Sequence, residues 1–196
     1  MKNVAIFASG SGTNFEALAE AIENKKIKAN LLLMVTDNPN AYVIKRASNH
    51  NVETLIFNPK DYAKKSDYEA MIVKRLDELK IDIICLAGYM RICGKTLLSS
   101  YEGKIINIHP ALLPSFKGAH GILDAYNYGV KVFGVTVHFV DAGMDSGKII
   151  DQEAFHVDED DSIDDVEEKI HAIEHVLYPK VLKKLCEENW NEKSVS

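Results

Sequence analysis

Short apolar runs alternate with amphipathic stretches along most of the 196-residue chain. The apolar runs predict strands at residues 3–9, 30–36, 52–57, 81–87 and 104–109. Stretches with helical spacing predict helices at residues 13–25, 41–50, 66–80 and 95–101. Ser66 and Glu69 predict a capping box at the start of the third of these helices. Buried strands separated by helices are typical of a parallel sheet that is covered on both faces.

The pattern changes in the last third of the chain. Residues 132–140 and 148–157 predict two strands, and the loop "DAGMDSG" between them is too short for a helical crossover. We therefore expect these two strands to pair antiparallel. A long final helix is expected from Asp164 to Glu188.

These elements predict an α/β fold: one Rossmann-like, mostly parallel twisted sheet with helices on both faces and an antiparallel C-terminal hairpin. We expect a single domain at residues 1–190 and a frayed polar tail at residues 191–196, because the chain contains no repeat, low-complexity tract or linker.

Charge and composition exclude several classes of protein. The net charge of −6 argues against a general nucleic-acid binder. No apolar run approaches the ~18 residues of a membrane span, and the N-terminal run Val4–Ala8 is too short for a signal peptide. We therefore expect a cytoplasmic protein without membrane contact. Three cysteines without CxxC spacing, and His109, His120 and His138 without compact ligand spacing, predict neither a disulfide framework nor a metal site.

A glycine-rich turn, residues 10–14, follows the first strand and precedes a helix. The N–H groups at a helix start are unpaired, so such a turn can hold a phosphate. The turn lacks the lysine of a P-loop, and Phe15 stands where a dinucleotide fingerprint needs a third glycine. Two readings stay open: a monophosphate site, or a plain turn in which Thr13 caps the helix and Glu16 completes a capping box. Asp37, after the second strand, is either a ribose-binding carboxylate or part of a turn.

Asn107 and His109 stand two residues apart at the end of a strand, so both side chains point to the same side of it. An asparagine NH₂ can donate to an oxyanion, and a histidine can donate or shuttle protons near neutral pH. This pair suits a tetrahedral intermediate at a carbonyl carbon. Asp141 or Asp145, in the loop of the later hairpin, could supply a carboxylate that favours the imidazolium.

Five motifs carry a resemblance to a known family. The chain resembles the phosphoribosylglycinamide formyltransferases, folate-dependent enzymes of purine synthesis, over residues 3 to about 188. The motifs, in family order, are "FASGSGTN", "LAGYMRI", "NIHPALLPSFKG", "GVTVHFVDAGMDSGKII" and "IEHVLYPKVL". The resemblance implies the formyltransferase fold and transfer of a formyl group from 10-formyltetrahydrofolate to the amine of glycinamide ribonucleotide. It implies small-molecule substrates, no metal, no nucleic acid, and a monomer or homodimer.

The resemblance also assigns roles to residues. The catalytic trio would be Asn107, His109 and Asp145. The phosphate would be held by Gly12, Thr13 and Asn14, and the ribose by Glu174. The folate pocket would contain Met90, Arg91, Ile92, Cys93, Asn107, Val140, Asp141 and Asp145. A further substrate loop would contain Pro110, Gly118 and His120.

The loop Ser115–Gly118 departs from the family pattern, in which a proline commonly precedes the glycine.

Methionyl-tRNA formyltransferase and formyltetrahydrofolate deformylase share the strand-end motif, but each carries an additional domain for which we expect no room here. A non-catalytic nucleotide-binding module is the alternative outside enzymes, and it would leave Asn107, His109 and Asp145 without a common role. Arg91 could pair with the glutamate tail of folate or be a solvated charge.

Overall fold

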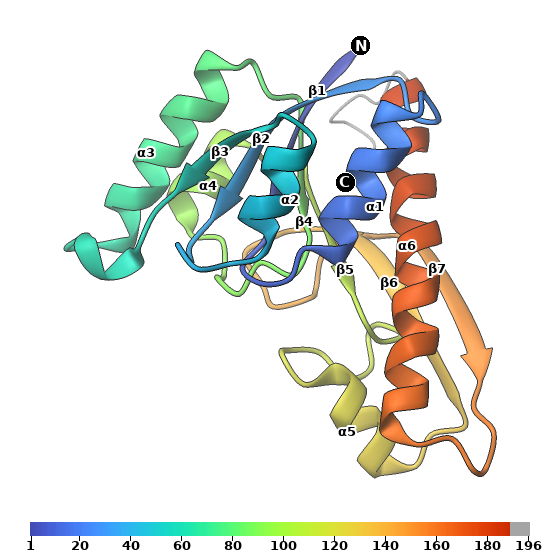
Figure 1. Ribbon diagram of the computed structural model, residues 1–196. Coiled ribbons are helices and arrows are strands. Elements are labelled where there is room, and N and C mark those ends of the chain that lie inside the picture. The colour runs from blue at the N-terminus through green and yellow to red at the C-terminus, as the bar shows by residue number, and fades with distance from the viewer. Residues whose placement is uncertain (189–196) are drawn as a thin grey trace.

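The computed structural model describes residues 1–188 as a seven-stranded sheet between two layers of helices (Figure 1). The expected polar tail at 191–196 lies outside the described residues. The strands are β1 (Lys2–Phe7), β2 (Ala29–Thr36), β3 (Glu53–Ile56), β4 (Ile83–Leu86), β5 (Ile105–His109), β6 (Val132–Phe139) and β7 (Ile149–His156). The helices are α1 (Thr13–Glu23), α2 (Val43–Asn49), α3 (Lys65–Glu78), α4 (Lys95–Ser100), α5 (Gly121–Tyr128) and α6 (Ile163–Glu187), with a 3₁₀ turn, η1, at Pro59–Asp61.

The sheet has the order β3-β2-β1-β4-β5-β6-β7. The five strands from β3 to β5 are parallel, whereas β6 runs antiparallel to β5 and β7 runs antiparallel to β6. The expected mostly parallel sheet with an antiparallel C-terminal hairpin is thus confirmed.

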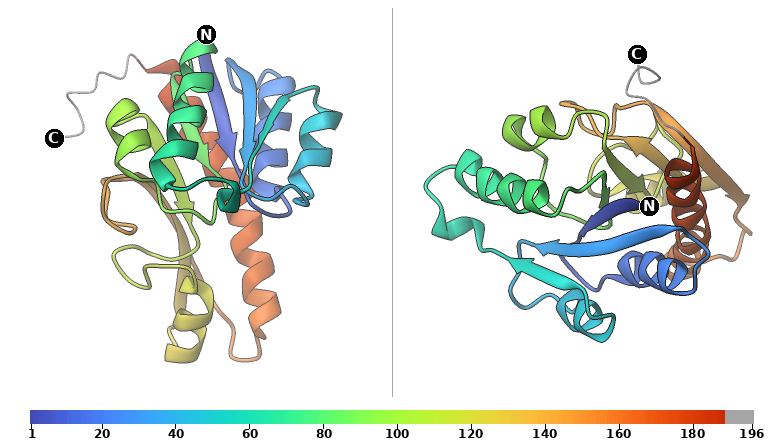
Figure 2. Two further views of the ribbon diagram at one scale, coloured as in Figure 1. Left: turned by 90° about the vertical axis from the view of Figure 1, so that its left-hand side faces the viewer. Right: turned by 90° about the horizontal axis from the view of Figure 1, so that it is seen from above.

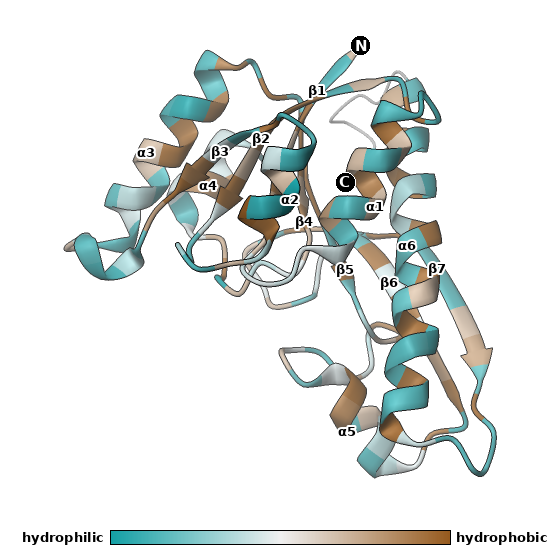
Figure 3. Ribbon diagram, viewed as in Figure 1, coloured by the Kyte–Doolittle hydropathy of each residue, from teal (hydrophilic) through white to brown (hydrophobic). Residues whose placement is uncertain are grey.

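Two hydrophobic clusters cover the two faces of the sheet. Helices α1, α2 and α6 pack on one face, and α3 and α4 pack on the other (Figure 2). Side chains of β1 alternate between the clusters: Val4 and Ile6 belong to the first, and Ala5 and Phe7 to the second. This burial on both faces explains the continuous apolar strands, which Figure 3 shows in brown between the teal outer faces of the helices.

The start of α3 differs from the sequence expectation. Lys64, not Ser66, precedes the helix, and the Asp67 carboxylate accepts the Lys64 N–H at 3.1 Å. Glu69 points inward instead, with 3 % of its surface exposed, and accepts the N–H groups of Gly94 and Leu97. The predicted Ser66–Glu69 capping box is wrong, because the Glu69 carboxylate binds N–H groups of a distant segment instead of the start of α3.

Helix α5 was absent from the sequence expectation. It has eight residues, begins after His120 without a side-chain cap, and leaves Leu123 and Tyr128 exposed. A short helix without a capping signal gives little periodicity to detect. Across residues 1–188, no helix is both long enough and apolar enough to cross a membrane.

Candidate active site

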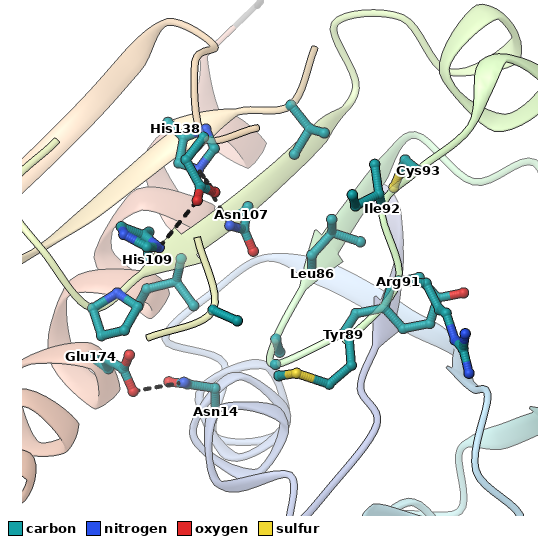
Figure 4. Close-up of a pocket in the computed structure, with 18 of the residues that line it drawn as sticks. Asn14, Leu86, Tyr89, Arg91, Ile92, Cys93, Asn107, His109, His138 and Glu174 are labelled. Carbon is teal, nitrogen blue, oxygen red and sulfur yellow. Dashed lines mark hydrogen bonds and ion pairs between the residues drawn. The ribbon is translucent and has the colours of Figure 1, made fainter. Parts of the chain in front are cut away.

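A cavity of about 610 Å³ opens where the parallel strands β1, β4 and β5 end. Its walls come from the glycine turn, the segment after β4, the end of β5, the β6–β7 loop and α6 (Figure 4). Ligands bind at this edge in open α/β sheets. Every site residue expected from the sequence lines the cavity except His120, which is exposed before α5.

The glycine turn positions the start of α1. Gly12 precedes the helix with φ of 75°, and a Cβ atom there would lie 2.5 Å from Cγ2 of Val43, so glycine is required. No side chain caps the helix, so the expected capping by Thr13 is wrong. Glu16 instead binds Arg46 at 2.9 Å and His50 at 3.0 Å. The first-turn N–H groups lack intrahelical partners and lie at the positive end of the helix dipole, as an anion site requires.

Asn14 and Glu174 join the turn to α6. The Nδ2 of Asn14 donates to Oε2 of Glu174 at 3.0 Å, and Oδ1 of Asn14 is buried without a partner among the described residues. Burial raises the pKa of Glu174, while the hydrogen bond from Asn14 and the charge of His171 oppose that rise. These acceptors suit the hydroxyl groups of a sugar.

His171 also lines the cavity and is not among the site residues expected from the sequence. It precedes Glu174 by three residues on α6, so the two side chains share one face of the helix. That spacing is the signal that could have identified it.

Asn107, His109 and His138 form the centre of the site on one face of the sheet. Asn107 lies opposite His138 in the β5–β6 register, and His109 lies opposite Thr136. The alternation predicted for Asn107 and His109 is therefore present, and β6 adds a second histidine. His138 could not be found from the sequence, because its pairing with Asn107 depends on the antiparallel register.

Hydrogen bonds fix the tautomer of His138. Its Nδ1–H donates to the Phe139 carbonyl at 2.8 Å, so Nε2 is the acceptor for the Nδ2 of Asn107 at 3.3 Å. Burial lowers the pKa of His138. This effect outweighs the hydrogen bond to the Phe139 carbonyl and the charge of Asp145, both of which raise the pKa. Neutral His138 thus orients the Asn107 amide and leaves its second N–H available.

Asp145 reaches over this face from the β6–β7 loop. Its Oδ2 lies 3.6 Å from Nδ1 of His109, and its Oδ1 lies 3.6 Å from Nε2 of His138. Oδ2 also accepts the Gly118 N–H at 2.8 Å. The Nε2 of His109 contacts the Phe116 carbonyl at 2.8 Å, so both nitrogens of His109 face oxygen acceptors. Nε2 is within hydrogen-bond distance of its oxygen, whereas Nδ1 is within ion-pair distance of Asp145.

The segment after β4 forms an apolar wall. Met90 and Ile92 are 71 % and 61 % exposed and line the cavity. Burial raises the pKa of Cys93 to about 12, so it is a neutral wall residue. Arg91 donates from Nε to Oδ2 of Asp37 at 2.7 Å, while its side chain stays 45 % exposed. Asp37 is nearly buried and does not line the cavity.

The remaining expected residues lie around this centre. Val140, Asp141, Pro110 and Gly118 line the cavity. Asp141 accepts the Gly143 N–H at 2.9 Å and thereby shapes the β6–β7 loop. Within residues 1–188, no group of three or more histidine, cysteine or acidic side chains could hold a metal.

The fold and the polar centre of the cavity define an enzyme class: the chain belongs to the formyl transferase family, whose model matches residues 2–182. Within that family, it is 47 % identical over 185 residues to the phosphoribosylglycinamide formyltransferase of Bacillus subtilis, which covers 94 % of this chain and 95 % of that protein. The crystal structure of glycinamide ribonucleotide transformylase 1 from Geobacillus kaustophilus matches with a TM-score of 0.93 and 50 % identity, over 95 % of this chain and 99 % of that one.

A larger relative contains a similar region. The trifunctional purine biosynthetic protein adenosine-3 of Drosophila melanogaster is 37 % identical over 186 residues, which are 94 % of this chain and 14 % of that protein. The resemblance inferred from the five motifs is confirmed by these relatives.

Proposed function

We propose that the chain transfers the formyl group of 10-formyltetrahydrofolate to the amine of glycinamide ribonucleotide, giving formylglycinamide ribonucleotide and tetrahydrofolate. One observation carries this proposal. Four polar side chains converge between the glycine turn, which can bind an anion, and the apolar wall after β4: Asn107, His109, His138 and Asp145. The family and the names of its relatives support the same reaction.

The two substrates enter from opposite sides of this centre. The N–H groups of Gly12, Thr13 and Asn14 hold the phosphate, and Glu174 accepts from the ribose hydroxyls. The pterin lies against Met90, Ile92 and Cys93, with Val140 and Asp141 closing the wall. Because the Arg91 side chain is held by Asp37, Arg91 contributes its backbone to the pterin site.

The chemistry takes place where the amine meets the formyl carbon. Asn107 donates its second N–H to the oxyanion that forms when the amine attacks. His109 donates through Nε2, once the Phe116 carbonyl has been exchanged for the substrate oxygen. Asp145 keeps a negative charge beside His109 and accepts the amine proton, directly or through water. The formyl carbon then releases the folate nitrogen, which takes up a proton as tetrahydrofolate leaves.

A formyl-transfer assay tests the proposal. The protein is mixed with 10-formyltetrahydrofolate and with glycinamide ribonucleotide, methionyl-tRNA or buffer alone, and tetrahydrofolate release is followed. We expect release that depends on the ribonucleotide. Transfer to methionyl-tRNA, or release in buffer alone at the same rate, would assign the site to another formyl-group enzyme. Binding of ribonucleotide without any release would indicate a non-catalytic module.

The location and assembly of the protein belong to the same proposal. We infer a cytoplasmic enzyme that acts as a monomer or homodimer, on small molecules alone. Light scattering coupled to gel filtration measures the mass in solution, and a subunit number above two would contradict this part.

A further inference from the structure

The wall segment, residues 87–94, has an unusual combination of properties. It contains neither helix nor strand, yet it holds the apolar side chains of Met90 and Ile92 in exposed positions at the cavity. A segment without its own hydrogen-bond ladder must be ordered by contacts with other elements. Those contacts come from residues that do not line the cavity.

Ser9, two residues after β1, holds the first half of the wall segment. Its N–H donates to the Gly88 carbonyl at 3.0 Å, and its hydroxyl oxygen accepts the Met90 N–H at 2.9 Å. The hydroxyl hydrogen goes to Oδ1 of Asp37 at 2.5 Å. Ser9 is 8 % exposed and Asp37 is 9 % exposed.

Asp37 also binds the wall segment directly. Its second oxygen accepts from Nε of Arg91 at 2.7 Å, and this hydrogen bond raises the pKa of Arg91. Asp37 therefore holds Met90 through Ser9 and holds Arg91 without an intermediary. Figure 4 shows the guanidinium of Arg91 directed away from Asn107 and His109.

Glu69, from α3, holds the C-terminal end of the wall segment. Its buried carboxylate accepts the Gly94 N–H at 2.5 Å and the Leu97 N–H at 3.3 Å. Lys65, one turn earlier on α3, donates to the Ile92 carbonyl. A Cβ atom at position 94 would lie 2.7 Å from Oε2 of Glu69, so a larger residue there would displace the Glu69 carboxylate.

We propose that Asp37 and Glu69 are positioning residues for the pterin: two carboxylates outside the cavity fix the ends of the wall segment and preorganise it for a flat ring. This inference rests on the proposed folate-dependent function. Neither carboxylate contacts the cavity, so each acts only through the backbone and Arg91. A wall that is ordered before binding loses less conformational freedom when the ligand arrives, which increases affinity.

Asp37→Asn is the principal test. The amide keeps the volume of the carboxylate, but its single oxygen can accept from only one of Ser9 and Arg91 and it carries no charge. We expect the Kd for tetrahydrofolate, measured by calorimetry, and the KM for 10-formyltetrahydrofolate to rise about ten-fold, as for loss of a hydrogen bond to a charged group. The KM for the ribonucleotide and kcat change less than two-fold.

Two further variants separate positioning from general instability. Glu69→Gln keeps one acceptor and should raise the same Kd by a smaller factor. Glu53→Gln is the matched control, because it breaks a carboxylate–arginine pair with Arg75 at the far edge of the sheet. We expect Glu53→Gln to leave both ligand affinities unchanged.

The outcomes distinguish this inference from the function on which it rests. A wild-type protein that binds no tetrahydrofolate would overturn the proposed function and the inference together. A wild-type protein that transfers formyl, with Asp37→Asn binding tetrahydrofolate equally well, would overturn the inference alone. Equal loss of affinity for both substrates in Asp37→Asn would also overturn it, because that is the result of a general structural role.

Discussion

The carboxylate of Asp145 faces two imidazoles with different hydrogen-bond partners. Burial lowers the pKa of His138 despite the opposing hydrogen bond to the Phe139 carbonyl, and that bond places the proton of the neutral ring on Nδ1. His109 presents both ring nitrogens to oxygen atoms, those of Asp145 and Phe116. The same carboxylate therefore faces His109, whose two nitrogens both lie near oxygen atoms, and His138, which serves as an acceptor for Asn107.

Removing either partner of the His109–Asp145 pair tests its importance. His109→Ala and Asp145→Asn should each lower kcat by about 10²-fold or more, in the range found for loss of an oxyanion donor. Initial rates of tetrahydrofolate release at saturating substrates measure this. His156→Gln, at an exposed position in β7, should keep the wild-type rate. Near-normal turnover in either test variant would remove that residue from the chemistry.

Between secondary-structure elements, charged side chains connect the short helix α2 to α1. His50, just after α2, lies 3.0 Å from both Glu16 and Glu23 of α1. Arg46 of α2 binds Glu16 and donates to the Ser11 carbonyl at 2.9 Å, next to the glycine turn. The anion-binding turn is thus supported by ion pairs behind it.

The α1–α2 connection predicts a pH dependence of stability. Burial alone lowers the pKa of His50, but its hydrogen bonds with Glu16 and Glu23 raise it overall. A raised folded-state pKa stabilises the protein fully below the unfolded value of about 6.5, and this contribution is lost as pH rises through the folded value. The difference in unfolding free energy between wild type and His50→Gln should therefore be larger at pH 5.5 than at pH 8.5.

Urea unfolding at the two pH values measures this difference, with His156→Gln as the control that removes an exposed histidine. A His50→Gln deficit that stays constant with pH would show that the ion pairs do not stabilise the charged form of His50.

The turn between β1 and α1 gives a second prediction at this scale. Gly12→Ala should lower the free energy of unfolding by about 1–3 kcal/mol, because a side chain meets Val43 and the left-handed φ is unfavourable. Gly10→Ala is the matched control, since a Cβ atom there contacts nothing within 4 Å. Equal urea midpoints for the two variants would contradict this account of the turn.

Much of this architecture could be predicted from local pattern. The five parallel strands and the antiparallel hairpin follow from apolar runs and loop length, and Asn107 and His109 follow from alternation. His138 could not be predicted, because register with β5 depends on the assembled sheet. Glu69 gave a misleading local signal, since its true partners, Gly94 and Leu97, lie 25 and 28 residues away.

For the whole molecule, the cavity joins the two halves of the sheet. The glycine turn belongs to β1 and α1, whereas Asp145 and Glu174 belong to the C-terminal hairpin and α6. A ligand that contacts both sides binds the folded chain and not the unfolded one, so it stabilises the fold by mass action.

Thermal unfolding tests this coupling. Glycinamide ribonucleotide at 100 times its Kd should add about 2.7 kcal/mol of stability. For a chain of this size, that raises the unfolding midpoint by about 5–10 °C. Ribose without the phosphate should leave the midpoint unchanged at the same concentration. An equal shift with ribose would show that the turn does not hold the phosphate.

The hydrogen bond between Asn14 and Glu174 connects residues that are 160 positions apart. During synthesis, the turn that carries Asn14 leaves the ribosome long before the helix that carries Glu174 has been translated. A growing chain can therefore complete its β1–α1 unit early, but it gains the full ribonucleotide pocket only when α6 has emerged and docked. The complete ribonucleotide pocket therefore exists only in a chain that includes α6.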